Sequence, residues 1–136
     1  MRIILDTNVL LVCISSHSKY HWIYQEYLAG NFTLCVTGEI LLEYEEVLTI
    51  NMGMEAAVAV IETITNNKNT ILADVYYKWN LIEIDKDDNK FVDAGLAANV
   101  QFIVSEDRHF DVLKKTGFPK IEVMSIEEFR DVLSKK

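Results

Sequence analysis

The sequence predicts an α/β protein, a three-layer α/β/α sandwich in which a central parallel sheet of four to five strands lies between helices. Short apolar runs alternate along the chain with longer segments whose apolar residues recur at helical spacing. Strands of a parallel sheet are covered on both faces, so their apolar residues are continuous rather than alternating. One domain over residues 1–136 is expected, because no linker, repeat or low-complexity tract interrupts the chain.

The first half of the chain is expected to alternate two strands with four helical segments. In order, these are a strand at 2–5, helices at 8–14 and 19–29, a strand at 32–36, and helices at 38–49 and 54–66. A polar stretch at 15–18 interrupts the first helix, and Gly30 is a natural C-terminal stop for the second. Thr37 can cap the third, since threonine is a favoured N-cap residue.

The second half continues the alternation. Its expected elements are a short helix and then a strand at 81–84 within residues 71–84, a helix at 88–98, a strand at 102–104, a short helix at 107–115, a strand at 121–124, and a final helix. Asp88 and Asp107 each stand where they can cap a helix. Ser125 and Glu128 have the spacing of a capping box for the final helix.

The charge balance does not by itself favour nucleic acid. The chain has 21 Asp and Glu residues against 13 Lys and Arg residues, which gives a net charge of -8. Nucleic-acid binders usually carry a basic face. An acidic chain can still act on phosphodiesters if its acids hold metal cations that bridge to the substrate, and it can also suit a basic protein partner.

The apolar runs and the two cysteines bear on where the protein is located. No apolar run approaches the roughly 18 residues that span a bilayer, and Asp6 interrupts the apolar start that a signal peptide would continue. Cys13 and Cys35 lie among apolar neighbours without metal-binding or disulfide spacing, so both are expected in the core. We therefore expect a cytoplasmic protein without a membrane segment.

Acidic residues recur where the predicted strands end. Asp6 follows the first strand, Asp85, Asp87 and Asp88 follow the strand expected at 81–84, and Asp107 follows the strand at 102–104. In open parallel sheets, ligands bind beyond the carboxyl ends of the strands, where the strand order reverses. Each acid alone can be a helix cap, but gathered carboxylates are costly unless a cation neutralises them.

A metal site with oxygen ligands is therefore predicted, and such ligands select Mg²⁺ or Mn²⁺ over zinc. Glu43 lies in the helix after the second strand, although the helical wheel does not separate it from Glu45. His17 and His21 are not expected to contribute, because they lack the glutamate of a zinc-protease motif. His109 follows Asp107 and Arg108 and could lie near the site, although a surface position is favoured. No serine-hydrolase elbow, phosphate-binding loop or dinucleotide fingerprint is present.

Four segments carry a resemblance to PIN domains, in the right order over about 100 residues. Ile-Ile-Leu-Asp6-Thr7-Asn8 resembles the opening strand with its first acid, and Thr37-Gly-Glu-Ile-Leu-Leu-Glu43 resembles the second motif. Asp87-Asp88-Asn-Lys-Phe-Val-Asp93-Ala resembles the third, and Ser105-Glu-Asp107 resembles the fourth, where the family usually has threonine first. The closing Ile-Glu-Val-Met-Ser-Ile-Glu-Glu-Phe is similar to the bacterial group assigned as toxins of toxin–antitoxin pairs.

The resemblance implies a set of site residues. The metal-binding and catalytic acids would be Asp6, Glu43, Asp88 and Asp107, with Asp93 as a less certain fifth ligand and Asp87 as the alternative to Asp88. Thr7 or Asn8 would orient the first acid, and Ser105 would keep a hydroxyl in the site.

The resemblance also implies an activity. One or two Mg²⁺ or Mn²⁺ ions would lower the pKa of a bound water for attack on a phosphodiester of single-stranded RNA. An antitoxin protein is the implied partner. Separately from the resemblance, a homo-oligomer could assemble a composite positive groove from dispersed basic residues, namely Lys86, Lys90, Arg108 and Lys114.

Two alternatives stay open from the sequence. The first is a PIN-like scaffold without catalysis that binds RNA or a protein partner. The second is a small-molecule phosphatase of the haloacid dehalogenase type, which Asn8 disfavours because that type has Asp-x-Asp after the first strand.

Overall fold

A five-stranded parallel sheet forms the centre of the protein. The structure, a computed structural model, describes residues 1–135. The strands are β1 (Arg2–Leu5), β2 (Thr33–Val36), β3 (Thr70–Leu72), β4 (Phe102–Val104) and β5 (Glu122–Met124), and they lie in the order β3-β2-β1-β4-β5. Every neighbouring pair is parallel. The sheet confirms the predicted parallel α/β architecture.

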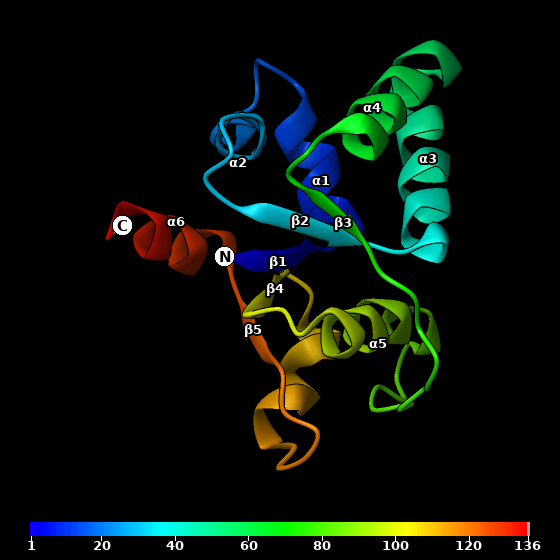
Figure 1. The fold of residues 1–136 in the computed structure, drawn as a ribbon, viewed down its shortest axis with the longest axis vertical. Coiled ribbons are helices and arrows are strands. Elements are labelled where there is room, and N and C mark those ends of the chain that lie inside the picture. Colours follow the sequence, from blue (N-terminus) through cyan, green and yellow to red (C-terminus); the bar gives the residue numbers. More distant parts are fainter. Residues whose placement is uncertain (136) are drawn as a thin grey trace.

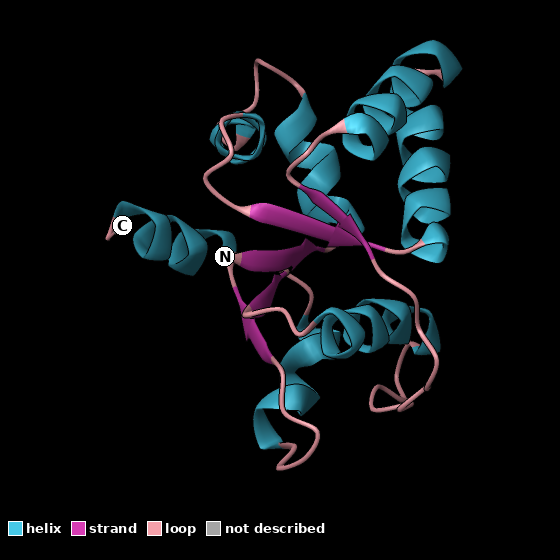
Figure 2. Ribbon diagram, in the orientation of Figure 1, coloured by secondary structure: helices cyan, strands magenta, loops and turns pink. Residues whose placement is uncertain are grey.

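Helices cover both faces of this sheet (Figures 1 and 2). They are α1 (Thr7–Ile14), α2 (His21–Leu28), α3 (Gly38–Met52), α4 (Met54–Asn66), α5 (Asn89–Ala98) and α6 (Ile126–Ser134), with 3₁₀-helices η1 (Lys86–Asp88) and η2 (Arg108–Lys115). Helices α1 to α4 lie on one face and α5 on the other. The three layers are those predicted, and no helix within residues 1–135 has both the length and the apolar character to cross a bilayer.

The strands are buried on both faces, as their apolar runs indicate. Ile3, Ile4, Leu34 and Ile103 are each at most 1% exposed. Helix α6 closes one end of the core through Phe129, whose ring packs edge-on against other aromatic rings 5.3 and 5.6 Å away. The capping box predicted at the start of α6 is present.

Gly95 allows α5 to lie close to the sheet. A Cβ atom at this position would stand 2.4 Å from Cδ1 of Ile121 and 3.1 Å from Cγ2 of Val100. A larger residue here would force the side chain of Ile121 to move, so glycine favours the close approach of α5, the helix that begins directly after Asp88.

The prediction for residues 71–84 is wrong. Strand β3 ends at Leu72, and residues 73–85 contain neither a helix nor a strand. The apolar character around Ile82 reflects burial of a loop residue: Ile82 is 1% exposed, and the side chain of Asn89 bonds both its backbone N–H and its C=O at 2.9 Å. An amide side chain thus satisfies the backbone groups that a neighbouring strand would otherwise satisfy.

The order of the strands reverses direction between β1 and β4, and we call this position the switch point. Strands β2 and β3 lie on one side of β1, whereas β4 and β5 lie on the other side. The carboxyl ends of β1 and β4 therefore flank the position at which ligands bind in open parallel sheets.

Candidate active site

Asp6 and Ser105 meet at the switch point. They directly follow β1 and β4, and the Asp6 N–H donates to the Val104 carbonyl at 3.0 Å. The Ser105 hydroxyl donates to Oδ2 of Asp6 at 2.8 Å. Asp6 is only 5% exposed and its side chain makes no capping bond to α1, so the carboxylate is directed to the site rather than used in the helix.

Ser105 also connects Asp6 to the fourth predicted acid. Its hydroxyl oxygen accepts the Asp107 backbone N–H at 2.9 Å, and Oδ1 of Asp107 in turn accepts the His109 backbone N–H at 2.9 Å. Asp107 therefore caps η2, as the sequence allowed, while its carboxylate stays at the sheet edge.

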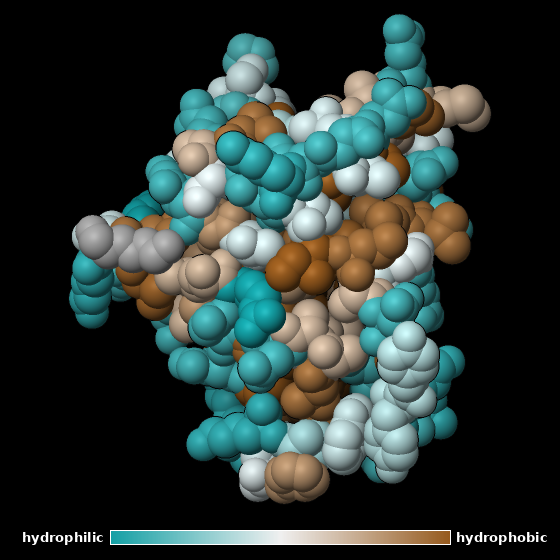
Figure 3. Space-filling view, viewed as in Figure 1, coloured by the Kyte–Doolittle hydropathy of each residue, from teal (hydrophilic) through white to brown (hydrophobic). Residues whose placement is uncertain are grey.

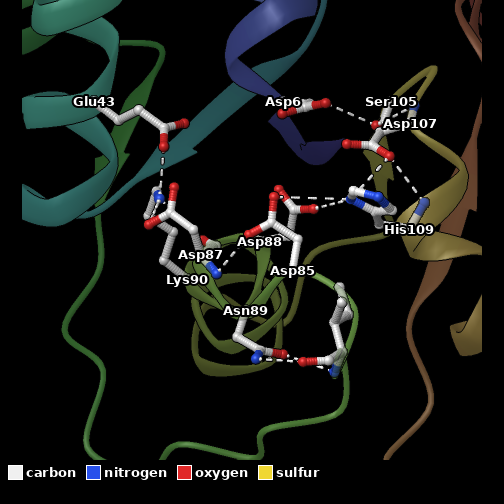
Figure 4. A network of polar contacts seen from close by, with 11 residues as sticks. Asp6, Glu43, Asp85, Asp87, Asp88, Asn89, Lys90, Ser105, Asp107 and His109 are labelled. Atoms are coloured by element: carbon white, nitrogen blue, oxygen red, sulfur yellow. Dashed lines mark hydrogen bonds and ion pairs between the residues drawn. The ribbon is translucent and has the colours of Figure 1, made fainter.

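His109 completes a cluster of acids from the other side of the edge (Figure 4). Its Nδ1 atom lies 3.0 Å from Oδ2 of Asp88, 3.3 Å from Oδ1 of Asp107 and 3.9 Å from Oδ2 of Asp85. One ligand atom each of Asp85, Asp88 and His109 lie within 4.8 Å of one another. We call Asp6, Asp85, Asp88, Asp107 and His109 the acidic cluster.

The electrostatics of the acidic cluster favour a cation. The pKa of Asp6 is raised to about 6, mainly by burial and also by the nearby charges of Asp88 and Asp107, while the bond from Ser105 acts in the opposite direction. Burial also raises the pKa of Asp88, assisted by Asp107 and Asp85. The hydrogen bond to Asp88 raises the pKa of His109, because it favours the protonated ring.

Glu43 belongs to a second polar group beside this cluster. Nζ of Lys90 lies 2.7 Å from Oε1 of Glu43 and 2.8 Å from Oδ1 of Asp87, and it donates to the Asp87 carbonyl at 2.9 Å. The Thr7 hydroxyl donates to the other oxygen of Glu43. Glu43 is thus the glutamate of α3 that faces the site, a choice that the helical wheel left open, whereas Glu45 is exposed.

Lys90 is a buried charge, 8% exposed. Burial alone would lower its pKa, but the hydrogen bonds to Asp87 and Glu43 outweigh burial and the pKa lies above the ordinary value. The bond from Lys90 is also the main cause of the lowered pKa of Asp87. Because Lys90 is paired inside the protein, the expectation that it lines a positive groove is wrong.

The structure separates the predicted residues by their contacts. Asp88 is buried among the acids, while the side chain of Asp87 is 70% exposed and pairs with Lys90. Oδ1 of Asp93 accepts the Trp79 backbone N–H at 3.0 Å, which ties the loop 73–85 to α5. The Thr7 hydroxyl bonds Glu43, while the Thr7 backbone lowers the pKa of Asp6 through a hydrogen bond.

Two site residues escaped the sequence analysis. For His109 a surface position was favoured, yet its ring lies among three carboxylates. Its position two residues after the Asp107 cap was the available signal, since a residue in the first turn of a capped helix lies close to the cap. Lys90 follows Asp88 by two residues, and a lysine in an acidic run signals an internal ion pair only once the fold is known.

A pocket opens beside Asp6 and Asp107. It has a volume of about 320 Å³, and Asn8 lines it together with apolar side chains of α1 and α6 and with Tyr20. The site therefore has acids on one side and a partly apolar hollow large enough for a planar ring on the other.

The donor set suits a divalent cation. Carboxylate oxygens from separate segments converge within the acidic cluster, and hard oxygen donors are those that Mg²⁺ and Mn²⁺ prefer. The pKa values of Asp6 and Asp88 are raised, which means that the surrounding protein does not fully stabilise the negative charge of either carboxylate.

The family model described as PIN domain matches residues 2–109 of the chain. This range contains all four of the motifs on which the resemblance was based. Among curated proteins, no sequence matches.

Solved structures share the fold at low sequence identity. VapBC2 from Rickettsia felis, bound to a DNA fragment from its promoter, gives a TM-score of 0.64 at 18% identity and covers 92% of this chain and 98% of that chain. Mycobacterium tuberculosis VapC20, a toxin that cleaves the sarcin-ricin loop, gives 0.60 at 15% identity, with 80% and 92% covered. The PIN domain of human SMG5 gives 0.55 at 12% identity, with 97% and 99% covered.

Proposed function

Because this chain belongs to the PIN domain family, we propose that it is a metal-dependent endoribonuclease that hydrolyses phosphodiester bonds of single-stranded RNA. The observation that carries the proposal is the acidic cluster at the switch point of the sheet, with Asp6 buried and its pKa raised to about 6. Perturbed carboxylates gathered in a hollow are typical of sites that bind cations or carry out catalysis. A fold shared with other proteins does not by itself provide this argument, because function depends on the site.

In this proposal the metal ligands are Asp6, Asp88 and Asp107, joined by Glu43 from α3. Asp88 is chosen over Asp87 because it is buried beside Asp107, whereas Asp87 is exposed and paired with Lys90. Asp93 is not included, because its carboxylate holds the backbone of Trp79. Bound Mg²⁺ or Mn²⁺ would lower the pKa of a water and stabilise the charge that develops on the phosphate.

The protein's own residues would then orient these ligands. Ser105 holds Oδ2 of Asp6 through its hydroxyl and holds the backbone of Asp107 through the same oxygen, so it fixes the distance between two ligands. Lys90 and Thr7 each hold one oxygen of Glu43. Nδ1 of His109, placed among three acids, can hold a proton near the reacting phosphate.

Cleavage of a labelled single-stranded RNA in Mg²⁺ or Mn²⁺ tests the proposal. Asp6→Asn keeps the size of the side chain and is expected to reduce the rate by more than about 100-fold. Asp111→Asn is the matched control, because Asp111 is exposed on η2 beside Lys114. EDTA should abolish cleavage and excess Mn²⁺ should restore it. Equal cleavage rates for the Asp6→Asn protein and the wild type would refute the assignment of Asp6 to the active site.

The partner is proposed on the same basis. A chain with the fold of VapC20, which is a toxin, is proposed to be the toxin of a toxin–antitoxin pair acting in the cytoplasm. The net charge of -8 would suit a basic segment of an antitoxin as well as it suits metal-bridged RNA. Growth arrest on expression of the wild type, but not of Asp6→Asn, is expected. Equal growth in both cases would contradict the toxin role.

A second candidate function is a scaffold that binds RNA or a protein without catalysis. The observation in its favour is that Lys90 already compensates Glu43, and His109 already faces Asp88. Calorimetric titration with Mn²⁺ separates the two candidates, because a scaffold need not bind the ion. Binding in the wild type that is lost in Asp6→Asn would favour the nuclease.

A further inference from the structure

Aromatic side chains gather on the loop 73–85, outside the acidic cluster. The rings of Tyr77 and Trp79 are 4.6 Å apart, and those of Trp79 and Phe118 are 5.9 Å apart, both edge to face. Tyr77 is 64% exposed and Phe118 82% exposed, so most of these two rings is uncovered. Tyr76, beside them in sequence, is 91% exposed. We call Tyr77, Trp79 and Phe118, with Tyr76, the aromatic surface.

The aromatic surface is fixed in place although it lies on a loop. Asp93 holds the backbone N–H of Trp79, and Asn89 holds both backbone groups of Ile82, so two residues of α5 anchor the loop. The same helix begins directly after Asp88. The aromatic surface and one acid of the acidic cluster are thereby attached to one rigid element.

A small pocket lies beside Lys78, the residue between Tyr77 and Trp79 in sequence. It has a volume of about 140 Å³, and its lining includes Lys78 and Asn80 from the loop as well as Asp87 and Lys90. Lys78 therefore lies next to the polar group that Lys90 forms with Glu43 and Asp87.

Lysines lie close to the aromatic residues in sequence, although the chain is acidic overall. Lys78 stands between Tyr77 and Trp79 in sequence and is exposed. Residues 114–120, which include Phe118, contain three lysines and no acidic residue. Lysine is depleted in interfaces between proteins, whereas aromatic rings next to lysines are the usual platform for single-stranded nucleic acid.

We propose that the aromatic surface binds the bases of single-stranded RNA next to the cleavage site, with Lys78 and the lysines of 114–120 contacting phosphates. The inference rests on the proposed function for the identity of the nucleic acid. It explains how a chain with a net charge of -8 holds a polyanion: stacking supplies the attraction that the overall charge does not. The view of Figure 3 shows large side chains of intermediate hydropathy on the part of the surface formed by this loop.

Binding is measured by fluorescence anisotropy with a labelled 12-nucleotide oligoadenylate in EDTA, where neither cleavage nor metal bridging contributes. Tyr77→Ala and Phe118→Ala are each expected to raise Kd about tenfold, since stacking of one base is worth about that much. Ile50→Ala is the matched control, because Ile50 is an equally exposed apolar residue, at 83%, on α3. Lys78→Gln should weaken binding, whereas Lys68→Gln should not, because Lys68 precedes β3 and the loop 73–85 leaves from the other end of that strand.

Trp79 provides a second readout. In a Trp22→Phe background Trp79 is the one remaining tryptophan, and its fluorescence should be quenched as the oligoadenylate stacks. Phe118→Ala should shift that titration to higher RNA concentration. Unchanged affinity in both ring variants would overturn the inference, and so would variants that lose self-association by sedimentation while binding RNA normally.

The experiments distinguish a failure of the aromatic surface from a failure of the proposed nuclease function. If wild type cleaves RNA in Mn²⁺ and the ring variants show unchanged KM, the aromatic surface is refuted and the nuclease stands. If wild type neither cleaves RNA nor binds Mn²⁺, the nuclease is refuted, and the anisotropy experiment in EDTA still decides whether the rings bind RNA. Raised KM with retained kcat in the ring variants is the outcome expected.

Discussion

Replacing Asp6 with asparagine is expected to stabilise the fold at neutral pH without divalent cations. Burial raises the pKa of Asp6 from 3.8 to about 6, so the folded protein holds this proton more tightly than the unfolded chain does. The wild type therefore loses stability as pH rises from about 4 to about 6, and the loss then levels off. At about 1.4 kcal/mol per pKa unit, the ionised carboxylate costs roughly 3 kcal/mol at pH 7.5.

Asparagine removes that cost and keeps a neutral acceptor for the Ser105 hydroxyl. The pKa of about 6 already includes the bond from Ser105, which lowers it, so the cost of about 3 kcal/mol is net of that bond. The expected gain in the free energy of unfolding is therefore about 3 kcal/mol at pH 7.5. At pH 4 the gain should disappear, because the carboxyl of the folded wild type is then protonated.

Urea denaturation in EDTA at the two pH values measures this difference, with Asp111→Asn as the control at an exposed site. Adding Mn²⁺ at about 100 times its Kd should stabilise the wild type by about 2.7 kcal/mol and leave Asp6→Asn unchanged. An Asp6→Asn protein that is less stable than wild type at pH 7.5 would refute the electrostatic reasoning, as would equal stabilisation of both proteins by Mn²⁺.

Three other substitutions follow from the same geometry. Ser105→Ala removes the donor to Asp6 and should lower cleavage or Mn²⁺ affinity about 10- to 100-fold in activity assays and calorimetry, whereas Ser105→Thr should retain most of both. Lys90→Met leaves Glu43 partly buried without its cation and should cost about 3 kcal/mol in urea denaturation. Asn89→Ala removes two bonds to the loop backbone and should cost about 2 kcal/mol, with faster amide exchange confined to residues 73–85.

Each of these has an outcome that would contradict it. Wild-type Mn²⁺ affinity and rate in Ser105→Ala would mean that the bond to Asp6 is dispensable. A Lys90→Met, Glu43→Gln double variant that shows no coupling energy would mean that the pair contributes nothing to stability. Uniform amide exchange across the chain in Asn89→Ala would locate the effect outside the loop.

The fold was largely predictable because the local signals agree with one another. The runs at 2–5 and 102–104 are buried on both faces, and their continuous apolar pattern predicts this. Ser125 and Glu128 form the capping box that their spacing indicates. Residues 81–84 misled the prediction because Ile82 is buried by contacts from α5 and not by a sheet, which no local pattern distinguishes.

The site was predictable only in its outline. Asp6 and Asp107 follow strands, so topology places them at one edge. Asp88 reaches that edge from the 3₁₀-helix η1 and not from a strand end, so it lies where expected for a different reason than the one predicted. His109 and Lys90 each have a partner far away in sequence, Asp88 and Glu43 respectively, and spacing carries no information on those contacts.

The bond from Ser105 to Asp6 joins residues 99 positions apart, and this has a consequence for how the protein is made. A ribosome adds about 5–20 residues per second, so Asp6 emerges about 5–20 s before Ser105 and Asp107 can reach it. During that interval β1 lacks its β4 neighbour, because β4 pairs with it only from Phe102 onward. A nascent chain therefore cannot bring all the acids together until β4 and Asp107 have been made, so the proposed nuclease would lack its site up to that point of synthesis.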